Sequence, residues 1–350
     1  MHASRRLPSG ASPFPFLVMT ALALGACSGR GGNTPPVGDL PDPEAEITRE
    51  SVDDHIRFLS SDSLKGRDPF SEDIALTEDY IAEQFRDAGL SEFPEFPGYK
   101  DSFSFEYRPR RDPDAASATY QLQNIVGFLE GTDTELKEEY ILFGAHHDHL
   151  GVRGEEADNI YNGADDNAAG TTAVIALAEY FAKARSNKRS LIFATFTAEE
   201  RGLVGSRHLA SNLPIAEAQL VCMINFEMIG KPAADGSWNL MFLGPEVSTL
   251  DEIFFEALDE DSPITLVGPE EHQVRYFRGS DNAAFHAEGF ITTTLASPQS
   301  TDDPYYHRPN DHYEFLNIDY MTDVIRTVVD ITEPLISGAA TPVKTLEGQG

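Results

Sequence analysis

Residues 140–149, YILFGAHHDH, are the most informative segment for the fold, because a short apolar run leads directly into three histidines and an aspartate. Apolar runs of this length, with β-branched and aromatic residues, are typical of buried strands in a largely parallel sheet. Comparable runs occupy residues 124–129, 191–196, 220–226 and 290–295. We therefore expect residues 140–145 to form one strand of a sheet whose other strands are spread along the chain.

Helical patterns separate these runs. Residues 72–90 place Ile74, Ile81 and Phe85 at helical spacing, and Gly89 predicts where that helix ends. Similar amphipathic patterns cover residues 172–184, 250–258 and 320–336. Alternating strands and helices predict an α/β fold, a doubly wound three-layer sandwich with a mostly parallel central sheet. In such folds ligands bind at the carboxyl ends of the strands.

The composition excludes several classes of protein. The 350 residues include 58 Asp and Glu against 26 Lys and Arg, which gives a formal net charge of −32. A surface of this charge does not attract nucleic acid or anionic lipid, so we expect no nucleic-acid partner. Two cysteines, Cys27 and Cys222, are too few for a disulfide framework. With 41% hydrophobic residues, the chain can bury a sizeable core.

The N-terminus has the pattern of an export signal. Arg5 and Arg6 precede an apolar stretch at residues 14–24, which is too short to span a bilayer. The following residues end in Cys27, and LGAC resembles a bacterial lipobox, in which the cysteine becomes lipidated. We expect an exported lipoprotein on the periplasmic face of the outer membrane or on the cell surface, attached only through this anchor. An ordinary cleaved signal with an incidental cysteine is the alternative.

Four segments are expected along the chain. We predict a lipoprotein signal peptide at 1–26, lipidated Cys27 with a flexible tether rich in Gly and Pro to residue 46, a single catalytic domain at 47–336 and a disordered tail at 337–350.

The histidine cluster at 146–149 suggests a metal site. Imidazole and carboxylate groups are ligands that suit zinc, although a solvated loop would also have this composition. On an extended backbone, His146 and Asp148 point to one side while His147 and His149 point to the other. One histidine would then bind metal while Asp148 holds its ring in orientation.

Other predicted strand ends carry acids as well. Loop 163–170 (GADDNAAG) presents Asp165 and Asp166, although a turn and helix cap would explain part of this pattern. The strand at 191–196 is followed by Glu199 and Glu200. Two carboxylates at a buried strand end repel each other unless a cation lies between them. If that cation is a metal, one glutamate can bind it while its neighbour acts as general base on water.

Five polar segments, taken in their order along the chain, resemble those of a known family. GAHHDHLG, NGADDNAAG, TAEERGLVGS, NFEMIG and YYHRPND resemble the ligand segments of the co-catalytic zinc exopeptidases of clan MH. That family includes bacterial leucine aminopeptidases, glutamate carboxypeptidase and glutaminyl cyclases. SSDSLKGRD, from Ser60, is similar to the family's N-terminal lead-in, so the resemblance extends from about Ser60 to Asp311.

The resemblance implies a role for each matched residue. One Zn²⁺ would be held by His146, Asp166 and Glu227, and the other by Asp166, Glu200 and His307, so that Asp166 bridges the two. Glu199 would be the catalytic general base. Asp148, Asp281 and Asp311 would hold ligands in place without touching metal.

Three positions depart from the family pattern. Glu227 stands where the family usually has the shorter Asp, and Asn282 follows Ser-Asp where the family more often has His. Tyr276 lies near the position of a tyrosine that stabilises the oxyanion in some relatives.

The resemblance therefore predicts a two-zinc metallopeptidase acting on peptides, most simply an aminopeptidase. Two alternatives remain open at this stage. One is a glutaminyl cyclase, which typically uses one zinc on the same fold, and the other is a non-catalytic binding module.

Overall fold

The computed structural model describes residues 45–108, 116–155, 157–244, 247–271, 273–301 and 303–345. The predicted signal peptide, Cys27 and the tether as far as residue 44 lie outside these residues, as do 346–350. Among the helices of the described residues, none is both long enough and apolar enough to cross a membrane.

An eight-stranded sheet forms the centre of the domain, in the order β1-β2-β6-β3-β7-β10-β8-β9. Its strands are β1 (Lys100–Tyr107), β2 (Ala118–Leu129), β3 (Tyr140–His146), β6 (Ser190–Phe196), β7 (Leu220–Glu227), β8 (Asn239–Leu243), β9 (Thr265–Val267) and β10 (Thr292–Ala296). Two short strands, β4 (Gly151–Val152) and β5 (Ile160–Tyr161), pair separately.

The sheet has a parallel centre that is flanked by antiparallel pairs, β2 with β6 on one side and β10 with β8 on the other, and its last pair, β8 with β9, is parallel again. β6, β3, β7 and β10 run parallel to one another, which confirms the predicted mostly parallel core. β2, which contains the predicted strand at 124–129, instead runs antiparallel to both β1 and β6. A short apolar run shows that a strand is buried but carries no information about its direction, so the sequence did not reveal this difference.

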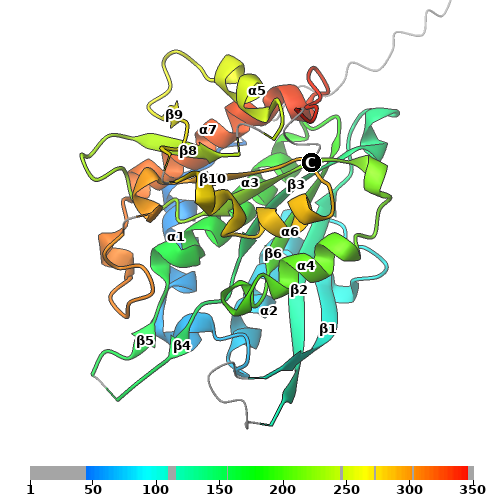
Figure 1. The fold of residues 1–350 in the computed structure, drawn as a ribbon. Coiled ribbons are helices and arrows are strands. Elements are labelled where there is room, and N and C mark those ends of the chain that lie inside the picture. The colour runs from blue at the N-terminus through cyan, green and yellow to red at the C-terminus, as the bar shows by residue number, and fades with distance from the viewer. Residues whose placement is uncertain are drawn as a thin grey trace, which may run out of the picture. The chain divides into compact units, whose positions relative to one another are not determined.

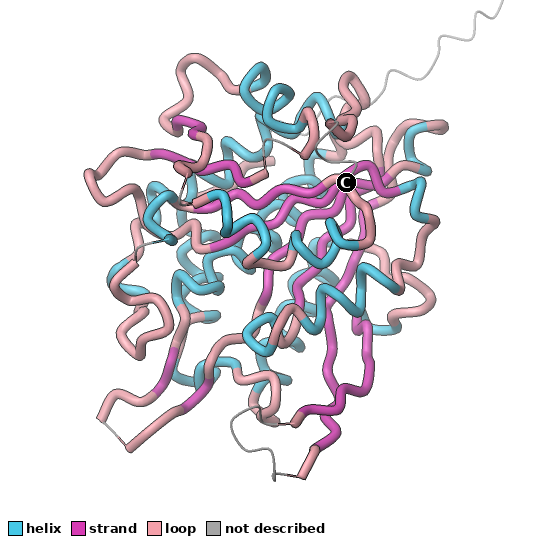
Figure 2. Tube along the Cα trace, viewed as in Figure 1, coloured by secondary structure: helices cyan, strands magenta, loops and turns pink. Residues whose placement is uncertain are grey.

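Helices cover both faces of the sheet (Figures 1 and 2). One face packs against α3 (Gly170–Ala184), with α1 (Arg49–Leu59), α2 (Ile74–Ala88), α5 (Leu250–Ala257) and α7 (Ile318–Ile336) beside it. The other face packs against α4 (Val204–Ser211) and α6 (Asn282–Ala287). The three-layer sandwich predicted from the sequence is therefore confirmed.

The local sequence explains where these elements form and end. All seven residues of β6 are buried, as expected of a strand covered on both faces. Gly89 ends α2 in the left-handed conformation, with φ of 83°, which a residue with a side chain adopts at a cost.

The prediction of a disordered tail from residue 337 is wrong for its first part. The side chain of Arg189 donates hydrogen bonds to the carbonyl oxygen of Ala340 and the hydroxyl of Thr341, and Ser248 pairs with Lys344. The small, polar composition of this segment did not reveal these partners, because they lie far away in the sequence.

Candidate metal centre

The carboxyl ends of three neighbouring strands supply the candidate site. β6, β3 and β7 lie side by side and parallel, so their ends meet at one edge of the sheet. β3 ends at His146, β7 ends at Glu227, and β6 leads into the turn that contains Glu199 and Glu200. The loop before α3 adds Asp166. The sheet topology thus brings together residues that are up to 81 positions apart in the sequence.

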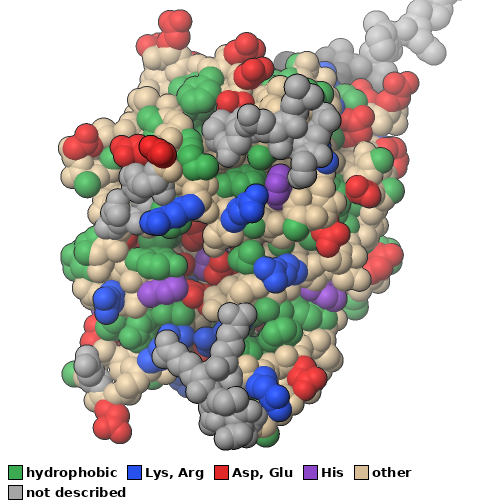
Figure 3. Space-filling view, viewed as in Figure 1, with side chains coloured by type: hydrophobic (Ala, Val, Ile, Leu, Met, Phe, Trp, Pro, Cys, Tyr) green, Lys and Arg blue, Asp and Glu red, His purple; other side chains and the backbone are tan. Residues whose placement is uncertain are grey.

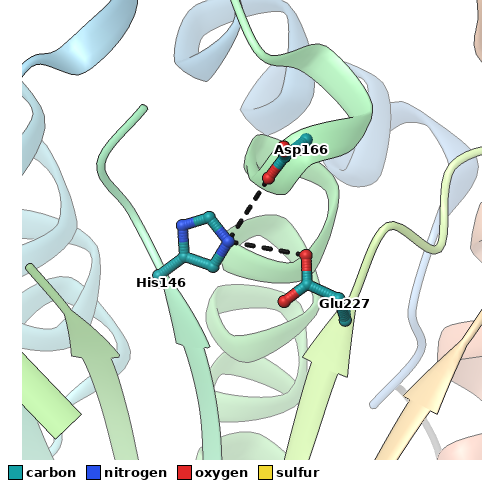
Figure 4. Close-up of side chains that lie close together, drawn as sticks. All are labelled: His146, Asp166 and Glu227. Carbon is teal, nitrogen blue, oxygen red and sulfur yellow. Dashed lines mark ion pairs between the residues drawn. The ribbon is translucent and has the colours of Figure 1, made fainter. Parts of the chain in front are cut away.

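His146, Asp166 and Glu227 form the first cluster (Figure 4). Nε2 of His146 lies 3.4 Å from Oδ1 of Asp166 and 3.5 Å from Oε1 of Glu227. The hydroxyl of Ser280 donates a 2.6 Å hydrogen bond to the other oxygen of Glu227. That bond leaves one carboxylate oxygen of Glu227 directed at the histidine.

The second cluster uses the other oxygen of Asp166. Oδ2 of Asp166 lies 3.3 Å from Nε2 of His307 and 3.8 Å from Nδ1 of His149. Oε1 of Glu200 lies 3.1 Å from Nε2 of His307 and 2.9 Å from Nδ1 of His149. Asp166 therefore presents one oxygen to each cluster, which is the arrangement expected of a carboxylate that bridges two cations.

Both clusters fit zinc. Ligands bound tetrahedrally to zinc at about 2.0–2.1 Å lie roughly 3.3 Å from one another, and the separations above fall around that value. Three buried atoms that converge in the second cluster have no hydrogen bond, namely Oδ2 of Asp166, Oε1 of Glu200 and Nδ1 of His149. Buried polar atoms normally have partners, so these atoms are placed to bind a cation.

Glu199 lies beside the first cluster. Burial raises the pKa of its carboxyl well above the usual value, and the carboxylates of Asp281 and Glu227 add to this effect, while His146 opposes it. Glu200 behaves in the opposite way. Burial raises its pKa and Asp166 adds to the rise, but the adjoining His149 and His307 outweigh both and lower it to about 2. The two adjacent glutamates thus occupy different electrostatic environments, as separate roles for them require.

Asp148 and Asp311 support the site through backbone groups. The carboxylate of Asp148 accepts hydrogen bonds from the amides of Glu199 and Glu200, at 2.9 and 3.4 Å. The ring of His146 is bonded through Nδ1 to the carbonyl oxygen of Asp148, at 3.1 Å. Oδ2 of Asp311 accepts from the amides of Asp165 and Asp166. Both aspartates therefore bond to the backbone of segments that contain predicted ligands.

Asp281 is fully buried, and neither of its carboxylate oxygens has a hydrogen bond. Burial raises its pKa to about 7, with opposition from His146 and a further rise from Glu227. It is thus close to the first cluster without bonding to a ligand, so an orienting role stays a prediction. Asn282, in the position where relatives more often have His, donates to the carbonyl oxygen of Phe277.

Arg67 was not predicted as a site residue, yet it holds two ligand segments. Its fully buried guanidinium donates to the carbonyl oxygens of His147, Asn162 and Gly163, among others. Burial lowers the pKa of this guanidinium to about 10, while Asp166 and other site carboxylates act to raise it. The motif SSDSLKGRD, which contains Arg67, is therefore bonded to two segments of the site, the one after β3 and the one before α3.

The backbone is unusual at several of these turns. Ala198, Met228 and His307 all have positive φ, of 54°, 48° and 56°. Such conformations cost about 1 kcal/mol or more and tend to cluster at functional sites, where the surrounding structure holds them. Each of the three is a ligand or lies next to Glu199 or Glu227.

A cavity opens onto the first cluster. In Figure 3, histidine and acidic side chains lie in a hollow on one face of the molecule. The cavity is lined by His146, Asp166, Glu199, Glu227, Met228, Leu243, Tyr276, Gly279, Ser280, Thr294, Ala296, Ser300, Asp303, Tyr306 and His307. His149 and Glu200 are not part of this lining.

Two tyrosines line the cavity. Tyr276 is bonded through its hydroxyl to Arg275, and its role at an oxyanion stays a prediction. Tyr306, which the sequence analysis did not single out, stacks on the ring of His307 with centroids 3.8 Å apart. Burial raises the pKa of Tyr306, and the carboxylates of Asp166 and Glu200 raise it further. Tyr306 therefore keeps its proton and faces the metal ligands.

The predicted ligands His146, Asp166, Glu200, Glu227 and His307 all meet at the two clusters, and Glu199 lies beside them. The expected orientation of His149 is wrong. The simple alternation of sides ends where β3 ends, at His146, and the chain then turns. His147 does point away, with Nδ1 3.0 Å from the hydroxyl of Thr195, whereas His149 returns to the second cluster.

Comparison with known proteins identifies the family and the fold. The sequence model of peptidase family M28 matches residues 124–332. A protein named "Probable zinc metalloprotease" from Pyrenophora tritici-repentis is 23% identical over 88% of this chain and 78% of its own length. The prediction of a zinc metallopeptidase of the exopeptidase type is confirmed.

Two solved structures share the fold. A zinc aminopeptidase from Bacillus subtilis has a TM-score of 0.64 at 14% identity, over 85% of this chain and 98% of that one. The glutaminyl cyclase of Porphyromonas gingivalis has a TM-score of 0.60 at 13% identity, over 83% of this chain and 99% of that one. At such identities the likeness concerns the fold, which does not separate these two activities.

Proposed function

The chain belongs to peptidase family M28, and we propose that it is an aminopeptidase that removes N-terminal residues from peptides with two zinc ions. The observation that carries this proposal is the pair of clusters that share Asp166, one oxygen to each, with Glu199 beside the first. A glutaminyl cyclase typically needs one zinc, so it would have no use for the second cluster of metal-ligating side chains around Glu200 and His307.

The site residues have two roles: some would bind metal, and one would transfer a proton. His146, Asp166 and Glu227 would hold one zinc, and Asp166, Glu200 and His307 the other. Bound there, the zinc ions would polarise the scissile carbonyl and make water acidic enough to serve as a nucleophile near neutral pH.

Glu199 is the group placed to move the proton. Its side chain lines the cavity together with His146 and Glu227, so it faces the space where substrate and water meet. As a general base it takes a proton from the attacking water, and it then returns that proton to the leaving amine. The hydroxyls of Tyr306 and Tyr276 line the same cavity and can donate to the developing oxyanion.

The cavity also suits a free N-terminus. Four acidic side chains line it, namely Asp166, Glu199, Glu227 and Asp303. Two of them would bind zinc and Asp303 pairs with Lys231, so Glu199 is the carboxylate left to attract a protonated α-amine. Met228, Leu243 and Ala296 form an apolar part of its wall. We therefore expect peptides with a free amine and an apolar first side chain to be the better substrates.

The first test is Glu199→Gln. This variant keeps the shape of the side chain but removes the base, so we expect both metals to remain bound while turnover falls by about 10²–10⁴-fold. Glu252→Gln, which changes an exposed glutamate in α5, is the matched control and should behave as wild type. Peptidase activity retained in Glu199→Gln would overturn the assignment of the base.

A panel of substrates tests the specificity. Aminoacyl peptides should be cleaved, whereas the same peptides with a blocked amine should not. Cyclisation of N-terminal glutamine without hydrolysis, together with one bound zinc per chain, would favour a glutaminyl cyclase instead.

We also propose that Cys27 anchors the exported enzyme to a membrane. The support for this lies in the sequence pattern at residues 1–27 alone. Labelling of cells with a radioactive fatty acid should mark the wild-type chain but not Cys27→Ser. An unlabelled wild type would contradict the anchor without affecting the catalytic proposal.

A further inference from the structure

We infer that His149 is a metal ligand, so that one of the two metal positions has four protein ligands and the other has three. This inference rests on the two-zinc site proposed above and adds a residue to it. The four-ligand position consists of His149, Asp166, Glu200 and His307. The three-ligand position consists of His146, Asp166 and Glu227.

The ring of His149 is buried against carboxylates of the second cluster. The residue is fully buried, and neither ring nitrogen has a hydrogen bond. Nδ1 instead faces two carboxylate oxygens, at 2.9 Å from Glu200 and 3.8 Å from Asp166. Those same two oxygens also lack hydrogen bonds. A buried imidazole that converges with a second imidazole on the same two carboxylate oxygens has the surroundings of a ligand rather than those of a packed side chain.

The distances in this group fit a single cation. The four separations that link His149 and His307 to the two carboxylates are 2.9, 3.8, 3.3 and 3.1 Å. Their spread is centred on the separation of roughly 3.3 Å expected between ligands of a tetrahedral zinc. The rings of His149 and His307 meet at an angle of 64°, with centroids 5.8 Å apart, so they approach the carboxylates from different directions.

The surrounding chain is built to place this ring. The amide of His149 donates a 3.0 Å hydrogen bond to the carbonyl oxygen of Arg67, whose side chain is itself fully buried. Gly163 packs directly on the imidazole, because a Cβ at that position would lie 2.5 Å from the ring carbons of His149. Gly163 also has a φ of 55°, which a residue without a side chain adopts easily.

His147 provides the contrast. It is equally buried and lies only two residues away, yet its Nδ1 is bonded to the hydroxyl of Thr195 on β6. Its Nε2 has no hydrogen bond, as is also true of His149, but His147 is part of neither candidate metal cluster. His147 therefore serves as the matched control for His149.

The inference gives the two metal positions different roles. A zinc with four protein ligands is closed, as in structural sites, whereas a catalytic zinc keeps an open position. The three-ligand position faces the cavity and has Glu199 beside it, while His149 and Glu200 are not part of the cavity lining. We therefore assign contact with the substrate to the zinc at the three-ligand position. The zinc at the four-ligand position would fix Asp166 and His307 in place.

The first experiment compares His149→Ala with His147→Ala by competition of each protein with a zinc chelator. Wild type and His147→Ala should bind two zinc ions per chain. In His149→Ala, one of the two affinities should fall by more than about 100-fold, which exceeds the usual effect of losing a group that only orients a ligand. Added imidazole should restore part of that affinity. Unchanged affinities in His149→Ala would overturn the inference.

The second experiment uses the unaltered protein, in case the variants do not fold. Crystals of the zinc-loaded wild type, measured at the zinc absorption edge, should place Nδ1 of His149 about 2.0–2.1 Å from one of two zinc ions. Two zinc ions with His149 bound to neither would refute this inference and leave the proposed function intact. A single zinc per chain would contradict the proposed two-zinc function itself.

Discussion

Asp165 and Asp166 are adjacent in the sequence but belong to two different clusters of carboxylates. Asp166 faces three histidines and two glutamates at the metal centre. Asp165 points the other way, toward Lys231, which also contacts Asp303 and Asp311. The two clusters adjoin each other, because Asp311 bonds to Lys231 and also to the amide of Asp166.

The cluster around Lys231 contains its own cation. The ammonium of Lys231 is almost fully buried and lies 2.5 Å from Asp303, 3.2 Å from Asp311 and 3.5 Å from Asp165. Burial lowers its pKa, but the three carboxylates outweigh this and raise it above the usual value. Burial raises the pKa of Asp165 to about 7, with Lys231 acting against the rise, so this carboxyl carries a proton for part of the time near neutral pH.

The metal centre has no lysine or arginine ion-paired with its ligand carboxylates among the interactions of the described residues. Its carboxylates face histidines, which must be neutral to bind metal. The difference between the cluster around Asp166 and the cluster around Lys231 shows that buried carboxylates alone do not identify a metal site. What distinguishes the two clusters is whether the chain supplies a permanent positive charge. The predictions below test that distinction, beginning with the largest expected effect.

The strongest test exchanges the neighbouring aspartates one at a time. Asp166→Asn removes the carboxylate shared by both metal positions, so we expect both metals to be lost and turnover to fall by more than about 1,000-fold, since bound metal contributes several kcal/mol to the barrier. Asp165→Asn should keep both metals, although it weakens the buried ion pair with Lys231 and should therefore lower the free energy of unfolding. Metal analysis and peptidase assays measure both effects. Equal metal loss in the two variants would contradict the comparison.

Lys231→Met tests the internal cation. Removing one partner of a buried ion pair leaves unpaired charges, so we expect the free energy of unfolding to fall by about 3–5 kcal/mol. Lys65→Met is the control, because Lys65 forms an exposed pair with Asp73 and its loss should cost less than about 1 kcal/mol. Chemical denaturation of the zinc-loaded proteins measures both values. Similar losses in the two variants would show that Lys231 does not stabilise its cluster in this way.

The pH dependence of metal binding tests the other cluster. Burial lowers the pKa of His307, but Asp166 and Glu200 outweigh this and raise it to about 10 in the metal-free protein. Metal must therefore displace a proton, and its affinity should rise by about tenfold per pH unit from pH 7 to 9.

The same pKa has a consequence for the stability of the metal-free protein. A raised histidine pKa stabilises the folded state fully below the unfolded value of about 6.5, and this stabilisation is lost as pH rises toward 10. Zinc titrations and denaturation at several pH values measure the two trends. An affinity that does not change with pH would contradict proton displacement.

The smallest expected effect is that of Glu227→Asp, which installs the residue more usual in relatives. The shorter side chain withdraws its oxygen from His146, now 3.5 Å away, and gives up the bond to Ser280. We expect the affinity of the three-ligand position to fall by less than about tenfold, because the remaining ligands are unchanged. The other zinc should bind as before. A tighter three-ligand position would show that Glu227 is a poorer ligand than Asp in this fold.

Much of the site was predictable from the sequence. The acids and histidines at the ends of apolar runs indicated a metal site at one edge of a parallel sheet, and His146, Glu199 and Glu227 do lie there. Lys231 and Arg67 were not predicted, because a single basic residue in a sequence gives no sign of the distant groups it will contact. The direction of β2 was missed for a similar reason, since its partners are set by the sheet as a whole.

Burial of the apolar runs leaves polar residues at the ends of the strands. The amino-acid sequence alone therefore sets which acids and histidines are present and after which strand each of them comes. Which residue of the pair Asp165 and Asp166, and which of the pair His147 and His149, faces the metal centre is a result of the tertiary structure. Asp166 rather than Asp165, and His149 rather than His147, turn toward the metal centre because the regular alternation of side chains stops where β3 ends and where the loop before α3 bends. The local backbone conformation there depends on contacts with Arg67, Asp311 and Gly163, which come from distant parts of the chain or from the facing loop.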